Sequence, residues 1–110
     1  MNHSPPSLES LLEDLSSPVH EPVRLGVLML LHLNPVLAFS TIQKALGVTS
    51  GNLNTHLAKL EDEGFISKEK GFVDLRPRTL VFITDNGRTA LVGYSGLLKQ
   101  VLITINPSVT

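Results

Sequence analysis

The stretch "ALGVTSGNLNTHLAKLEDEGF", residues 45–65, decides how this chain folds. Leu53, Leu57 and Leu60 recur at the spacing that places apolar side chains on one face of a helix. The positions between them are mostly small or hydrogen-bonding, and no acidic residue occurs in the stretch before Glu61. The pattern therefore predicts an amphipathic helix whose outer face is polar, slim and lightly charged.

Capping residues set the bounds of this helix and of a shorter one before it. Thr49 is a favourable N-cap, so we predict a helix over residues 49–63. Ser40 is expected to cap a two-turn helix, "TIQKAL" at residues 41–46, and Gly47 suits its left-handed end. Two short helices joined by a tight turn that contains glycine form a helix-turn-helix.

Two further helices are predicted before this motif. "SLESLLEDLS", residues 7–16, carries leucines at amphipathic helical spacing and is expected to end before Ser17–Pro18. Pro22 suits the first turn of the next helix, which is predicted to end at Asn34–Pro35. Because this second helix is apolar on nearly every side, we expect it to lie at the centre of the fold.

The spacing of the apolar residues changes after Gly64 from a helical to a strand-like pattern. "FISKEK" (residues 65–70) alternates, "GFVDLRPR" (71–78) has the composition of a loop, and "TLVFIT" (79–84) is rich in β-branched and aromatic residues. These segments predict a β-hairpin with Arg76 and Arg78 at a basic tip, and Thr84–Asp85 is expected to begin a last helix. The predicted fold class is mainly α with a small β-hairpin (α+β), a winged helix-turn-helix with added N- and C-terminal helices.

Composition indicates one globular domain. The chain has 110 residues, of which 42% are hydrophobic and 17% are charged, enough for a single modest core. No apolar run reaches the roughly 18–20 residues that span a bilayer. The N-terminus lacks the basic start and apolar stretch of a signal peptide, so we expect a cytoplasmic protein without membrane association.

Residues that carry reactive chemistry are few. The chain has no cysteine, which excludes disulfides and thiolate catalysis. The acids of "LEDEG" (60–64) lie beside no plausible nucleophile, and no glycine-rich phosphate motif occurs. We therefore expect no enzymatic activity and no cofactor. No metal site is expected either, because no two of the four histidines stand at ligand spacing on one element: His3, His20, His32 and His56.

Charge is segregated along the chain, although the formal net charge is only −1. Residues 1–21 carry acids but no lysine or arginine, and residues 22–60 carry bases but no acid. Residues 68–88 hold more bases than acids. This distribution permits a mildly basic face, but the excess alone does not establish one.

From about Val23 to Leu98 the chain resembles the MarR/ArsR-type winged-helix transcriptional regulators, in particular their short single-domain members. The resemblance rests on "STIQKALGVTSGNLNTHLAKLEDEGFI" (40–66) and "DLRPRTLVFITDNGRTAL" (74–91). Within the second segment, Asp74-Leu75-Arg76 resembles the D-x-R wing motif and "ITDNGR" resembles the L-T-x-x-G-R helix start. The resemblance implies a homodimer that binds a pseudo-palindromic operator. It leaves any small-molecule effector unknown, because the chain lacks the long flanking helices and the cysteine-based metal sensor of other members.

The outer face of the helix predicted at 49–63 suits the major groove, where base edges are read by hydrogen bonds. Thr49 and Ser50 can meet a phosphate at the helix N-terminus, and Gly51 permits a close backbone approach. Asn52 and Thr55 are the best candidates for contacts with bases. The lysines and arginines of this helix and of the hairpin are expected to contact the phosphates. The candidate DNA-binding residues are therefore Ser40, Thr49, Ser50, Gly51, Asn52, Asn54, Thr55, Lys59, Lys68, Lys70, Arg76 and Arg78.

The predicted terminal helices carry more apolar surface than a small monomer can cover. Burial against each other across a two-fold axis is the most economical solution, and folding back onto the same domain is the alternative. The residues predicted to dimerise are Leu8, Leu11, Leu12, Leu15, Leu91, Tyr94, Leu98, Val101 and Ile105.

Together these patterns predict three parts: a helix in residues 1–18 that contacts a dimer partner, a winged helix-turn-helix DNA-binding domain in 19–88, and a dimerisation helix in 89–110. The predicted function is sequence-specific transcriptional regulation, with residues 49–63 in the major groove and the wing, 70–78, on the minor groove or backbone. An alternative stays open. The same fold can serve as a protein-interaction module in which the polar helix is merely exposed.

Overall fold

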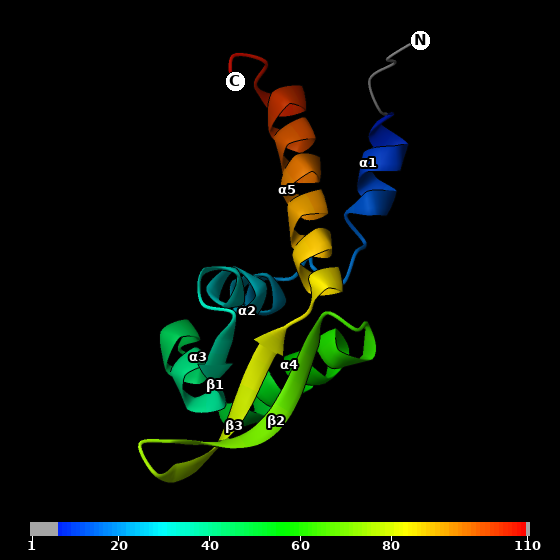
Figure 1. Ribbon diagram of the computed structural model, residues 1–110. Helices are drawn as coiled ribbons and strands as arrows, with labels where there is room; N and C mark the ends of the chain where they lie inside the picture. Colours follow the sequence, from blue (N-terminus) through cyan, green and yellow to red (C-terminus); the bar gives the residue numbers. More distant parts are fainter. Residues whose placement is uncertain (1–6, 110) are drawn as a thin grey trace.

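A computed structural model describes residues 7–109 of the chain, as five helices and a small antiparallel sheet (Figure 1). The helices are α1 (Leu8–Asp14), α2 (Pro22–Leu33), α3 (Phe39–Leu46), α4 (Ser50–Asp62) and α5 (Asp85–Ile105). The strands are β1 (Val36–Ala38), β2 (Ile66–Val73) and β3 (Arg76–Ile83), and they pair in the order β1-β3-β2. This is the winged helix-turn-helix that the sequence predicts.

Side-chain caps define where most of the helices begin. The Thr49 hydroxyl accepts a hydrogen bond from the backbone N–H of Asn52 (3.0 Å), which confirms the predicted start of α4. Gly47 ends α3 with a left-handed backbone (φ 64°), also as predicted. The predicted cap at Ser40 is wrong. Pairing of β1 with β3 keeps Ala38 extended, so α3 begins at Phe39, and Ser40 lies inside the first turn.

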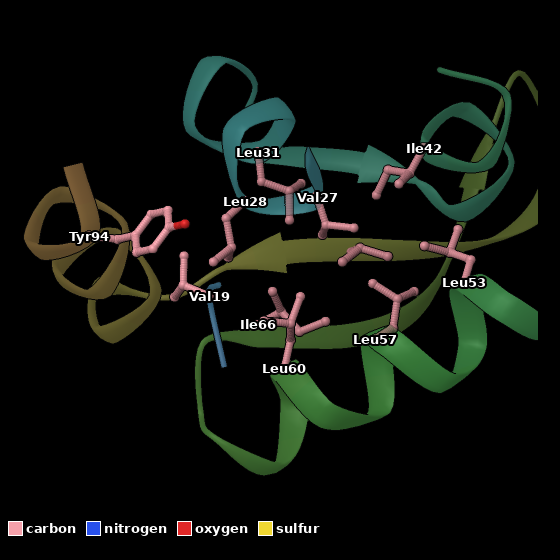
Figure 2. Packing of buried hydrophobic residues seen from close by; sticks show 11 residues of the cluster. Val19, Val27, Leu28, Leu31, Ile42, Leu53, Leu57, Leu60, Ile66 and Tyr94 are labelled. Carbon is pink, nitrogen blue, oxygen red and sulfur yellow. The ribbon is translucent and has the colours of Figure 1, made fainter. Parts of the chain in front are cut away.

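The hydrophobic core lies where α2, α4 and the sheet meet (Figure 2). As predicted, α2 is central: it contacts α3, α4, α5 and β3, and Val27, Leu28 and Leu31 are fully buried. The three leucines of α4 close the core from the opposite side, and Ile42 of α3 lies on the same side as α2 (Figure 2). Burial of one such aliphatic side chain contributes about 1.5–3 kcal/mol, so this cluster holds α4 in a fixed orientation.

The hairpin is longer and tighter than the sequence predicts. Strands β2 and β3 pair from Ile66↔Ile83 to Val73↔Arg76, so only Asp74 and Leu75 form the turn. Both turn residues have positive φ (52° and 64°), as a type I′ turn requires. The predicted loop over 71–78 is therefore wrong. Arg76 and Arg78 lie in β3 rather than at the tip, because strand pairing overrides the loop propensities of glycine and proline.

Helix α5 extends well beyond the rest of the molecule, and α1 lies beside it (Figure 1). The chain measures 56 × 27 × 23 Å, with a radius of gyration of 16.3 Å. A compact chain of this length has a radius of gyration of about 13 Å. Among the described residues, no helix combines the length and the hydropathy needed to cross a bilayer.

Candidate nucleic-acid interface

The outer face of α4 is exposed to solvent. Its inner face is fixed by Leu53, Leu57 and Leu60, none of which has any exposed surface. Seven candidate residues at and along α4 are exposed: Thr49, Ser50, Gly51, Asn52, Asn54, Thr55 and Lys59. A Cβ atom added at Gly51 would meet nothing within 4 Å, so the fold itself does not require glycine there.

The hydrogen-bonding groups of this face are partly committed within the chain. The hydroxyl of Thr49 accepts the cap bond, and the hydroxyl of Thr55 donates to the carbonyl oxygen of Gly51 at 3.0 Å. With its proton engaged, Thr55 offers a base an acceptor and a methyl group rather than a donor. Asn52 and Asn54 keep both donors and acceptors on their exposed amide groups.

A hollow of about 450 Å³ separates α4 from the wing. It is lined by Phe39, Asn54, Lys68, Glu69, Lys70 and Thr79, so it brings together three candidate residues, Asn54, Lys68 and Lys70, from α4 and β2. Lys70 Nζ donates to the Thr79 hydroxyl across the hairpin at 3.3 Å. Asn54 is the α4 residue that lines this hollow together with the two lysines of β2.

Two of the candidate lysines are paired with acids at the far end of α4. Lys59 Nζ lies 3.5 Å from a carboxylate oxygen of Glu63, and Lys68 Nζ lies 3.4 Å from one of Glu61. Both lysines would have to exchange these partners in order to bind phosphates. Exposed ion pairs of this kind contribute at most about 1 kcal/mol, so the exchange costs little.

The hairpin carries its bases on two opposite faces. Side chains alternate along a strand, and residues paired across two strands share a face. Ile66 is buried, so Lys68 and Lys70 point to the same side of the sheet as α4. Arg76 and Arg78 fall on the other side, and Arg78 donates to the carbonyl oxygen of Pro77 at 3.0 Å. The structure does not bring the two arginines together with the lysines.

A polar cluster behind α4 was not identified from the sequence. His56 Nδ1 on α4 lies 3.1 Å from Arg24 Nη1 and 3.3 Å from Glu21 Oε2, and Arg24 Nε donates to the carbonyl oxygen of Pro18 at 2.6 Å. One ring nitrogen cannot serve both partners: it accepts from Arg24 when unprotonated and donates to Glu21 when protonated. The sequence feature that could have pointed to this cluster is Glu21, an acid directly before Pro22, which forms the N-cap of α2.

The electrostatics of this cluster favour a charged Glu21. Partial burial alone raises the pKa of its carboxyl group, but hydrogen bonds from the backbone N–H groups of Arg24 and Val23 act in the other direction. With the neighbouring His56 and Arg24 side chains, they hold the pKa of Glu21 below its usual value. The cluster therefore ties the N-terminus of α2 to the middle of α4.

The residues predicted to dimerise fall into two groups. Leu11 and Tyr94 are buried within the chain, where Tyr94 shares a hydrogen bond with His20 and burial raises the pKa of its hydroxyl. Leu15, Leu91, Leu98 and Val101 are partly covered by the same chain, whereas Leu8, Leu12 and Ile105 are 60–76% exposed. A second hollow, of about 370 Å³, lies between α2 and α5 and has an almost entirely apolar lining that includes Met29, Val92 and Leu98.

Within residues 7–109, no cluster of three or more histidine, aspartate or glutamate side chains has the arrangement to hold a metal ion. His3, the first of the four histidines weighed as metal ligands, lies outside the described residues.

Comparison with solved structures gives the same fold over most of the chain. A transcriptional regulator homologue from Pyrococcus horikoshii OT3 is 38% identical, with a TM-score of 0.82 over 90% of this chain and 99% of that one. The transcriptional repressor CouR, bound to a 23-mer DNA duplex, is 25% identical, with a TM-score of 0.69 over 89% of this chain and 71% of that one. A MarR-family protein from Enterococcus faecalis V583 shares the fold at 20% identity, with a TM-score of 0.70 over 96% of this chain and 94% of that one.

Sequence comparison agrees. The uncharacterized protein MJ0432 of Methanocaldococcus jannaschii is 38% identical over 72 residues, which are 66% of this chain and 78% of that one. The family model described as a winged helix DNA-binding domain matches residues 23–102. The resemblance to MarR-type regulators is thus confirmed at the level of the winged-helix fold, which the chain shares with solved transcriptional regulators. The matching family is one of DNA-binding domains rather than enzymes. The chain belongs to the winged helix DNA-binding domain family.

Proposed function

We propose that this chain is a sequence-specific transcriptional regulator that binds duplex DNA as a homodimer. Helix α4 enters the major groove, and the wing, residues 70–78, lies on the minor groove and backbone. The observation that carries the proposal is the outer face of α4: every candidate side chain on it is exposed, and no acid occurs on the helix before Glu61. A helix with such a face can approach both base edges and phosphates.

The N-terminal half of α4 supplies the base contacts in this proposal. Asn52 and Asn54 present amide groups that can pair bidentately with adenine, a contact that contributes about 1–3 kcal/mol of discrimination. The backbone N–H groups at Ser50 and Gly51 lie at a helix N-terminus, where the dipole favours a phosphate. Lys70, across the hollow from Asn54, would contact the backbone beside the groove.

The homodimer is supported by apolar surface that the single chain leaves open. Leu8 and Leu12 on α1 and Val92, Leu102 and Ile105 on α5 are each at least half exposed. These positions lie on the part of the molecule that extends away from α4 (Figure 1). Pairing there would leave both copies of α4 free, as binding to two half-sites requires. A cytoplasmic location is consistent with this function.

Fluorescence anisotropy with the upstream DNA of the chain's own gene tests the proposal. We expect binding that weakens steeply with salt, with a slope of about −0.9 for each phosphate neutralised. Arg76→Ala should make that slope shallower by about 0.9 for each phosphate that the arginine neutralises, whereas Lys99→Ala, an equal change of charge on α5, should leave it unchanged. Absence of binding by the wild-type chain, or equal slopes for both variants, would favour a protein-interaction module instead.

Base reading has its own test. A footprint first locates the binding site within the upstream DNA. Asn52→Ala should then lower the affinity for this site relative to the affinity for random DNA, by an amount equivalent to about 1–3 kcal/mol. An equal loss on both DNAs would make Asn52 a backbone contact, and the specificity would then have to come from elsewhere on α4.

A further inference from the structure

The tip of the wing is apolar, exposed and conformationally strained. Leu75 is 96% exposed and Phe72 is 74% exposed, the former at the turn and the latter at the end of β2. Asp74 and Leu75 both have positive φ. A type I′ turn is ordinarily built from asparagine, aspartate and glycine, which adopt this conformation more readily than leucine does.

Leu75 therefore destabilises the folded chain in two ways. Its branched side chain is held in a left-handed backbone conformation, and nearly all of its apolar surface faces water. Local strain of this kind is concentrated at functional sites, where the surrounding structure maintains it. The eight-residue pairing of β2 with β3 supplies that support, since it closes the turn from both sides.

Basic side chains surround the apolar tip on both faces of the hairpin. Lys70 lies on the face that α4 shares, and Arg76 and Arg78 lie on the opposite face. Asp74 is the single acid in residues 70–78, so the tip keeps a positive balance. Two basic faces separated by the thickness of a hairpin match the two phosphate strands that border a minor groove, whose potential is strongly negative.

We infer that Leu75 enters the minor groove as an apolar wedge between two adjacent base pairs, while the flanking bases hold the phosphates on either side. The inference rests on the proposed function and adds a mode of contact to it. Inserted leucine or phenylalanine side chains unstack a base step and kink the duplex. Because pyrimidine–purine steps unstack most readily, Leu75 becomes a specificity determinant that reads deformability rather than base edges.

The test uses the footprinted upstream duplex with 2-aminopurine placed, one position at a time, at adenines that the wing protects. Insertion of Leu75 should unstack one of these bases and raise its fluorescence on the order of severalfold. Leu75→Asn removes the wedge but adopts positive φ easily, so this variant should unfold at a temperature no lower than the wild type. Leu75→Met should retain the fluorescence rise. The matched control is Leu33→Asn, which changes a leucine of 76% exposure at the end of α2.

A second measurement addresses specificity. Replacing the unstacked pyrimidine–purine step by a stiff AA step should weaken wild-type binding on the order of tenfold. Binding of Leu75→Asn should change far less, and that of Leu33→Asn should follow the wild type. If the wild type binds without any fluorescence rise, or if Leu75→Asn behaves like the wild type, the wedge is wrong and the regulator stands. If the wild type binds no duplex at all, both proposals fail, and the apolar tip is a contact for another protein.

Discussion

Gly87 is the residue at which the fold depends most directly on the absence of a side chain. It is buried in the first turn of α5, and a Cβ atom there would lie 2.1 Å from the carbonyl oxygen of Phe65. The sequence shows this glycine only as part of a helix-start motif. Its physical reason, the close approach of α5 to the chain leaving α4, becomes visible only in three dimensions.

Gly87→Ala should destabilise the chain by at least about 1–3 kcal/mol, because backbone atoms rather than a flexible side chain must move. The measurement is the free energy of unfolding in urea. Gly51→Ala serves as the control, since its added methyl group would meet nothing within 4 Å and should change stability by less than about 1 kcal/mol. Equal midpoints for the two variants would contradict this account of Gly87.

Glu21 should make the stability of the chain depend on pH. The pKa of its carboxyl group is lowered in the folded state, so its contribution is complete above the ordinary value of 4.5 and is lost as the pH falls through the lowered value. Glu21→Gln should therefore be less stable than the wild type at pH 7, and the difference should shrink in acid. Urea unfolding at a series of pH values measures it. A constant difference would show that the hydrogen bonds matter and the charge does not.

At the scale of whole elements, the helices that depend on patterns within a short stretch of sequence were predicted well. Leucine spacing and the cap at Thr49 placed α4 within one residue of its observed ends, and the apolar composition of α2 predicted its central position. The start of α3 and the turn of the hairpin were predicted wrongly. Both depend on pairing with β3, and a Pro77 that signals a loop in the sequence occupies a strand once Phe72 pairs with it.

The candidate site was predictable to the same extent. The exposed face of α4 follows from the same spacing that buries its leucines. The approach of Asn54 to Lys70, and the separation of Lys70 from Arg76 onto opposite faces, depend on strand register. A one-residue error in the turn reverses the face of every hairpin side chain, so sequence alone could not assign them.

Arg24 should hold α4 in place through its contacts with Pro18 and His56. Arg24→Met keeps the long side chain but removes both contacts, and should cost about 1.5–3 kcal/mol, the range for hydrogen bonds to charged groups. Lys44→Met, an equivalent change at an exposed position of α3, should cost less than about 0.5 kcal/mol. Thermal and urea unfolding compare the two. If both variants lose the same stability, the contacts of Arg24 contribute nothing specific.

At the scale of the whole molecule, the chain has a compact part, which contains α4 and the wing, and an extended part formed by α1 and α5 (Figure 1). The extended part leaves apolar side chains of α1 and α5 exposed to solvent. The radius of gyration, well above that of a compact chain of this length, reflects the second part. This surface is the reason to expect self-association.

Replacing Leu102 and Ile105 by serine should shift the chain from dimer to monomer. Each buried aliphatic side chain contributes about 1.5–3 kcal/mol, so the dissociation constant should rise at least about 100-fold. Analytical ultracentrifugation over a range of concentrations measures this, with Leu75→Asn on the wing as a control that should remain dimeric. A wild-type chain that sediments as a monomer at every concentration would contradict dimerisation through α5.

Hydrogen bonds and close packing connect the end of α4 to the start of α5. The Thr84 hydroxyl donates to the carbonyl oxygen of Gly64 at 2.6 Å, the Thr84 N–H donates to that of Phe65, and Gly87 packs against the same carbonyl. In a pair of chains joined through α5, the angle between the two long helices would then fix the separation of the two copies of α4. The number of base pairs between half-sites would be set at this joint, and an operator lengthened by half a turn would place one half-site on the wrong side of the duplex.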